Sequence, residues 1–222
     1  MNRRMLSLAL PAVVAATAGA YAFGGWASIT LDELPDAYTV GKPTEISFRI
    51  RQHGMTPLEG LTPTIDARSS AGGGSVQTVA RAGKEKGQYV ATLTIPRAGD
   101  WQVDVKSGFG RSDVHLLPMA AVAAGTATPA IAEYDRGRRL FAAKGCVNCH
   151  VHSALEQVPL FETGPNLSDK RFDAAYLAMW LANPAIRPPT NNGQAMPNLG
   201  LSSREIASLV TFVNNGKVAT NR

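Results

Sequence analysis

The sequence predicts two domains of different class, an all-β sandwich followed by an all-α domain. Before residue 117, apolar and polar residues alternate in several short runs, as they do in half-buried strands. After residue 131, apolar residues recur at the three- and four-residue spacing of amphipathic helices. An uncharged, alanine-rich stretch separates these parts. We therefore expect a sandwich at 23–117, a linker at 118–130 and a helical domain at 131–222.

Residues 1–22 predict an export signal. Arg3 and Arg4 precede an uncharged apolar stretch that ends in Ala20-Tyr21-Ala22, a small-residue cleavage signature. An uncleaved anchor is the alternative, because residues 5–28 are uncharged and a bilayer span needs about 20 apolar residues. Both outcomes place the rest of the chain outside the cytoplasm. We expect a periplasmic or other extracytoplasmic protein, with membrane association if the anchor remains.

Residues 26–117 predict about seven short strands. Alternation is clearest in Ile46/Phe48/Ile50, Leu93/Ile95 and Trp101/Val103/Val105. Further strands are expected at 27–31, 64–68, 76–81 and 112–117, with glycine-rich turn signals between them. This number and spacing of strands indicate an immunoglobulin-like sandwich.

The last third of the chain predicts three helices. The first two are expected at 132–143 and 173–182. The third begins with a capping box formed by Ser202 and Glu205 and ends before Gly216. Its apolar stripe consists of Ile206, Leu209, Val210 and Val213. Long loops connect these helices, so a buried apolar cofactor would enlarge an otherwise thin core.

The only two cysteines lie in the motif Cys146-Val147-Asn148-Cys149-His150. Cysteines at this spacing can each add to a haem vinyl group, and the following histidine then ligates the iron. A redox dithiol is one alternative, although it does not require the histidine. A zinc site is another, which would need further Cys or His at ligand spacing. The motif favours a single covalent haem c.

Met196 is the predicted second axial ligand. It lies in a polar loop rich in Gly and Pro, where a methionine that merely fills a core is not expected. Met179 belongs to a predicted helix, and His152 is too close to His150 to reach the opposite side of the haem. Histidine and methionine together would keep the iron six-coordinate, which suits an electron carrier and not an enzyme.

Residues 134–216 resemble a class I cytochrome c. The shared residues are Gly137, Leu140-Phe141, Gly145, the haem motif, Gly164-Pro165-Asn166-Leu167, Asn183-Pro184, Met196-Pro197-Asn198-Leu199 and Glu205-Ile206. The resemblance implies that the first and last helices cross, with Gly137 and Phe141 near Phe212.

The same resemblance implies the roles of the site residues. Cys146 and Cys149 would hold the haem through thioether bonds. His150 and Met196 would be the axial ligands of its iron. The Pro165 carbonyl would accept a hydrogen bond from the His150 ring and fix its orientation.

The N-terminal part resembles, more loosely, the exported YtkA-like sandwich. The shared stretches are Gly24-Gly25-Trp26, Gly41-Lys42-Pro43, Arg51-Gln52-His53-Gly54 and Ala98-Gly99-Asp100-Trp101. The resemblance implies oxidase assembly or metal handling as possible roles. His53 with Met55, and His115 with Met119, are candidate Cu(I) ligands, because that ion binds imidazole and thioether. We favour the simpler interpretation of two structural histidines and two unrelated methionines.

Taken together, the sequence predicts an exported mono-haem cytochrome that carries single electrons to or within a membrane respiratory complex. Its partners would be redox subunits of that complex, onto which the sandwich would dock or space the haem domain. The alternative is a haem-containing copper-handling or oxidase-assembly factor that uses the sandwich. The net charge of +5 includes no Lys/Arg-rich run, so we expect no nucleic-acid partner.

Overall fold

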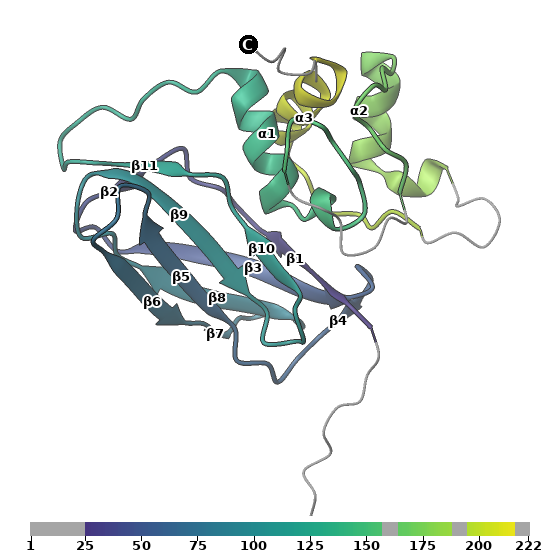
Figure 1. Cartoon of the computed structure of the whole chain (residues 1–222). Helices are drawn as coiled ribbons and strands as arrows, with labels where there is room; N and C mark the ends of the chain where they lie inside the picture. Colours follow the sequence, from purple (N-terminus) through teal and green to yellow (C-terminus); the bar gives the residue numbers. More distant parts are fainter. Residues whose placement is uncertain (1–24, 157–163, 188–194, 216–222) are drawn as a thin grey trace, which may run out of the picture.

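A computed structural model describes residues 25–156, 164–187 and 195–215. The predicted signal at 1–22 and the predicted helix stop at Gly216 lie outside these residues. Of the alternative anchor at 5–28, only residues 25–28 are described, and Ala27 and Ser28 belong to a strand of the sandwich. Figure 1 shows two parts, a β-sandwich and a helical domain beside it, which confirms the predicted fold class. Within the described residues, no helix combines the length and apolar character needed to cross a bilayer.

The sandwich consists of two sheets. One has the strand order β1-β3-β8-β7, with β4 also paired to β3. Its strands are β1 (Ala27–Leu31), β3 (Thr44–Gln52), β4 (Thr56–Pro57), β7 (Arg81–Ala82) and β8 (Gln88–Leu93). The other has the order β2-β11-β9-β5-β6, with β10 also paired to β9. Its strands are β2 (Tyr38–Thr39), β5 (Thr64–Ser69), β6 (Ser75–Val79), β9 (Gly99–Lys106), β10 (Asp113–His115) and β11 (Met119–Val122).

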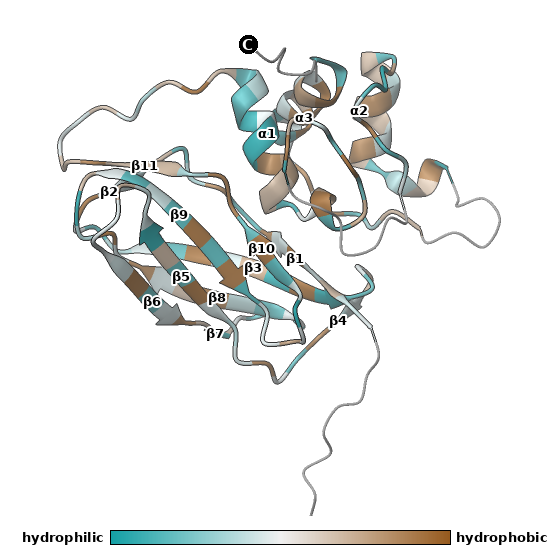
Figure 2. Ribbon diagram, in the orientation of Figure 1, coloured by the Kyte–Doolittle hydropathy of each residue, from teal (hydrophilic) through white to brown (hydrophobic). Residues whose placement is uncertain are grey.

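Alternation along the strands produces the core between the sheets. Phe48 and Ile50 of β3 are fully buried, as are Trp101 and Val103 of β9 in the opposite sheet, and all belong to one apolar cluster. Figure 2 shows the corresponding change between apolar and polar residues along these strands. Burial of these large side chains supplies the main driving force for packing the sheets together.

The structure differs from the predicted linker at its beginning. Residues 119–122 form β11, which pairs with β9 and runs parallel to β2. Met119 lies opposite Trp101 and is 1% exposed, so it belongs to the core of the sandwich. The strand was missed because alanine gives little alternation of hydropathy. Residues 123–132 then connect β11 to the first helix without strand or helix.

The helical domain contains the three predicted helices, α1 (Glu133–Ala143), α2 (Ala174–Ala182) and α3 (Ser203–Asn215), and two 3-10 turns, η1 (Cys146–Asn148) and η2 (Pro184–Ile186). The capping box of α3 is present: the Ser202 amide donates to the Glu205 carboxylate at 2.9 Å, and the Glu205 amide donates to the Ser202 hydroxyl at 3.3 Å. Two bonds at the first turn therefore fix where α3 begins.

Helices α1 and α3 cross in close contact. A Cβ atom at Gly137 would lie 2.0 Å from the Ser208 carbonyl oxygen, so only glycine permits this approach. One turn later, the rings of Phe141 and Phe212 pack with their centroids 5.4 Å apart. The crossing implied by the resemblance is confirmed.

Candidate functional site

The two cysteines and His150 lie on one tight turn that directly follows α1. Gly145 has a φ of 76°, which ends the helix and starts η1. The amides of Cys149 and His150 both donate to the Cys146 carbonyl, at 3.2 and 2.9 Å. The turn thus gathers two half-buried cysteines, not joined by a disulfide, and an imidazole on a five-residue peptide.

The electrostatics of Cys146 disfavour the dithiol alternative. Burial, together with the neighbouring Cys149 sulfur, raises the pKa of the Cys146 thiol to about 12. A nucleophilic redox cysteine instead has a lowered pKa, because its thiolate performs the attack. At neutral pH Cys146 is a thiol, the form whose S–H adds across a vinyl group with both atoms retained in the product.

His150 is held in an orientation suited to metal ligation. Its Nδ1 donates to the Pro165 carbonyl at 2.9 Å, the bond that the resemblance implied. A Cβ atom at Gly164 would lie 2.4 Å from Cε1 of the ring, so the glycine admits the imidazole against its backbone. Burial lowers the pKa of His150, although the bond to Pro165 opposes this shift. A neutral ring with Nδ1 protonated leaves the Nε2 lone pair for a metal.

Met196 lies beside the same apolar cluster as the cysteine turn. Met196 and Cys146 are both partly buried against the core of the helical domain, which includes Leu140 and Leu177. The structure thus brings the predicted second ligand to the cluster that also adjoins the cysteine turn. Residues 157–163 and 188–194, which flank these segments in sequence, lie outside the described residues.

Buried polar atoms also fit a bound group. Trp180 Nε1, on α2, is buried and has no hydrogen-bond partner in the described structure. Buried donors are normally paired, so one left unpaired is expected where a ligand with oxygen atoms completes the site. Two thiols, an oriented imidazole, a nearby thioether and this donor are together compatible with covalent haem.

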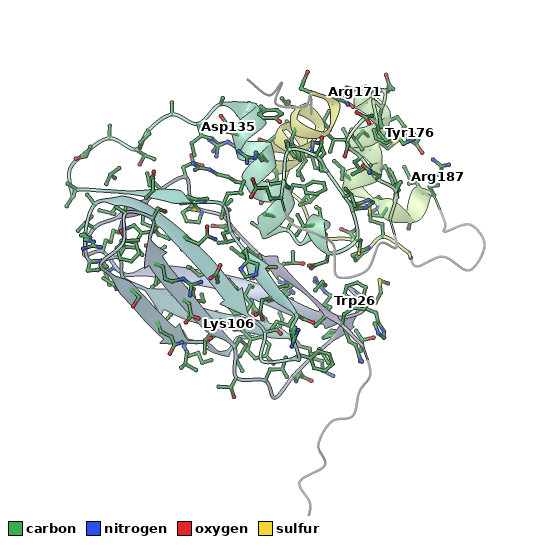
Figure 3. The ribbon with its side chains drawn as sticks, viewed as in Figure 1. Trp26, Lys106, Asp135, Arg171, Tyr176 and Arg187 are labelled. Carbon is green, nitrogen blue, oxygen red and sulfur yellow. The ribbon has the colours of Figure 1, made fainter. Side chains whose placement is uncertain are left out.

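Three of the four candidate copper ligands have structural roles in the sandwich, and the fourth, Met55, is 52% exposed. His53 and Gly54 have φ values of 52° and 73° and occupy the hairpin turn between β3 and β4. The ring of His53 packs against Trp26, labelled in Figure 3, with centroids 5.9 Å apart. His115 bonds to the Asp104 carboxylate at 2.8 Å, and Met119 belongs to the core. The described residues contain no group of three or more His, Cys, Asp or Glu that could hold a metal.

Sequence reasoning missed the contacts between the domains next to the haem motif. Lys144 is 2% exposed, and its ammonium group donates to the carbonyls of Leu31 and Asp32. Asp36, in the loop between β1 and β2, accepts hydrogen bonds from the guanidinium of Arg136 on α1. These partners are about a hundred residues apart, so no local pattern could indicate them.

Comparisons with known proteins follow the same division of the chain. The cytochrome c family model matches residues 134–217, and the YtkA-like family model matches residues 27–106. No curated protein matches the chain.

Several solved structures are similar to part of the chain. The Lin-41 filamin domain is 13% identical with a TM-score of 0.34, and the match covers 44% of this chain and 90% of that one. Trypsin-activated alpha-2-macroglobulin from Escherichia coli is 16% identical with a TM-score of 0.34, over 44% of this chain and 7% of that one. Domains 4 and 5 of the S-layer protein SbsC are 15% identical with a TM-score of 0.30, and the match covers 43% of this chain and 51% of that one.

Proposed function

Because the chain carries a YtkA-like domain followed by a cytochrome c domain, we propose that it is an extracytoplasmic electron carrier with one haem c. The observation that carries this proposal is the cysteine turn, with the His150 ring fixed by the Pro165 carbonyl. Cys146 and Cys149 would hold the haem, and His150 would ligate its iron. The bound haem would supply the one-electron couple between ferric and ferrous iron.

Met196 completes the proposed coordination. Its thioether would serve as the second protein ligand of the haem iron, beside His150, and would keep a site closed to other ligands. Sulfur ligation and the surrounding apolar cluster, which excludes water, would both favour ferrous iron and so raise the reduction potential. The chain therefore orients the cofactor and tunes it, without a position at the iron for a substrate.

The location and partners are proposed from the N-terminal sequence and the domain order. The signal or anchor at residues 1–22 would deliver the chain outside the cytoplasm. The sandwich then lies between that segment and the haem domain. We propose that it docks or spaces the haem relative to redox subunits of a membrane respiratory complex.

The haem assignment is tested on mature protein from a host that attaches haem c. We expect a coloured protein whose mass equals that of its polypeptide plus one haem, and which is reduced and reoxidised reversibly. Cys146→Ala or Cys149→Ala should weaken this covalent attachment. A colourless wild-type protein with the mass of the polypeptide alone would contradict the proposal.

The role of Met196 is tested separately. We expect Met196→Ala to lose the far-red absorption of sulfur-ligated ferric haem, to bind carbon monoxide when reduced and to have a lower reduction potential. Met179→Ala is the matched control, because Met179 is 56% exposed on α2 and should leave all three properties unchanged. Carbon monoxide binding by the wild-type protein would argue for an open iron position instead.

A further inference from the structure

The ammonium group of Lys144 is buried, and all of its N–H donors are paired. It lies at the seam between the two domains, where β1 and residues 32–36 contact α1. It donates to the Leu31 carbonyl at 2.9 Å and to the Asp32 carbonyl at 2.8 Å, and it lies 2.7 Å from Glu205 Oε1. A lysine has three N–H donors, so these three acceptors use all of them. A buried charge is tolerated only when it is paired and hydrogen-bonded in this way.

The first two acceptors join the sandwich to the haem peptide. Leu31 and Asp32 lie at the end of β1, whereas Lys144 precedes Cys146 by two residues. The backbones are also in direct contact, because a Cβ atom at Gly145 would lie 2.6 Å from the Ile29 carbonyl oxygen. Figure 1 shows α1 ending beside β1 and β10. β1 therefore packs directly against the start of the cysteine turn.

The third acceptor joins Lys144 to the segment that carries Met196. Glu205 accepts from the Ser202 amide at 2.9 Å through its other oxygen, Oε2. Between Met196 and Ser202, the Asn198 side chain accepts from the Gly200 amide at 3.0 Å and fixes a turn. Through Lys144, β1 is therefore linked to the residue before the cysteine turn and to the first turn of α3, which follows the segment that carries Met196.

We infer that Lys144 is a positioning residue through which the sandwich sets the geometry of the haem site. This inference rests on the proposed haem function. Two axial ligands from distant segments can both bond one iron only if their spacing is fixed. Lys144 links those segments to each other and to β1, so the sandwich is part of the framework of the site in addition to any docking role.

The test uses the full-length haem-loaded protein and compares Lys144→Met with Arg136→Met. Arg136 lies at the same seam, with its side chain 13% exposed, but its guanidinium bonds the carboxylate of Asp36, in the loop between β1 and β2. Both variants should accelerate amide hydrogen exchange at the seam. Only Lys144→Met should shift the reduction potential and lose the far-red sulfur band at lower pH than the wild type.

Other outcomes distinguish this inference from the proposed function. If Lys144→Met exchanges faster at β1 but keeps the wild-type potential and band, Lys144 only joins the domains and the positioning role is wrong. If that variant does not mature, Glu205→Gln provides the test, because it weakens the link to α3 and leaves the bonds to Leu31 and Asp32. We expect Glu205→Gln to have a lower reduction potential than the wild type and to lose the far-red band at lower pH, and an unchanged potential and band would overturn the inference. Failure of the wild type to bind haem would instead contradict the proposed function.

Discussion

At the scale of single residues, position 145 requires glycine for two separate reasons. Its φ of 76° lies in the left-handed region, which an L residue with a Cβ adopts at a cost of about 1–2 kcal/mol. Its missing side chain also admits the Ile29 carbonyl of the neighbouring domain. The first requirement is common to many turns, whereas the second exists only because β1 lies against the haem peptide.

A pair of glycine substitutions separates these requirements. We expect Gly41→Ala to lower the free energy of unfolding by about 1 kcal/mol, because Gly41 has a φ of 72° but no atom within 4 Å of a Cβ. Gly145→Ala should cost more, about 3 kcal/mol, because the methyl group also displaces β1. Chemical denaturation followed by tryptophan fluorescence measures both. Equal losses in the free energy of unfolding would show that β1 moves away from Gly145 without an energetic cost.

At the scale of elements, the α1–α3 crossing supports the turn that would hold the haem. α1 leads directly into the cysteine turn, and α3 follows the Met196 segment, so their contact fixes one ligand segment relative to the other. The close approach at Gly137 and the packing of Phe141 on Phe212 determine this contact. Helix propensity alone would favour alanine over glycine at position 137 by about 1 kcal/mol.

The Gly137→Ala variant therefore shows whether the α1–α3 contact or helix propensity has the larger effect on stability at this position. We expect a net loss of about 3 kcal/mol or more in the free energy of unfolding, because the methyl group would force α1 away from the Ser208 carbonyl. Asp135→Ala, on the exposed side of α1 labelled in Figure 3, should change stability by less than about 0.5 kcal/mol. A Gly137→Ala protein that melts at or above the wild-type temperature would mean that the crossing is loose.

At the scale of the whole molecule, charged contacts hold the domains together beside the apolar ones. Asp36 accepts from Arg136 of α1, and its carboxylate lies 3.9 Å from the guanidinium of Arg204 of α3. Apolar packing adds to these contacts, since Ala143 of α1 joins the core of the sandwich and Leu34 and Leu117 pack against the helical core. The two folds therefore form one molecule with a shared seam.

This seam should weaken in acid. The hydrogen bond from Arg136 lowers the pKa of Asp36, so folding favours its ionised form. The associated stability is complete above the ordinary carboxyl pKa of about 3.8 and is lost as the pH falls through the depressed value. We expect the protection factors of the amides at residues 32–37, which correct for the intrinsic pH dependence of exchange, to fall in that window. Asp36→Asn should show lower protection already at neutral pH, and wild-type protection that stays constant until global unfolding would contradict this account.

Local patterns in the sequence were sufficient for most elements. Alternation located the principal strands, and the capping box located the start of α3. The contact of His150 with the Pro165 carbonyl was implied by the resemblance to class I cytochrome c and not by a local pattern. The short strand β11 was not predicted, because its alanines give little alternation in hydropathy. Copper ligation was one interpretation of His53, and the hairpin turn supplies a backbone reason for that residue instead.

The two domain classes and the cysteine motif could be predicted without a structure, because periodicity and motif spacing act between residues close in the chain. The contact of β1 with the cysteine turn, and the bonds of Lys144 to both domains, became apparent only from the folded chain. The acceptors of Lys144 are two backbone carbonyls and one distant carboxylate. Every residue has a carbonyl, so no side-chain pattern can reveal which of them a folded chain will place within reach.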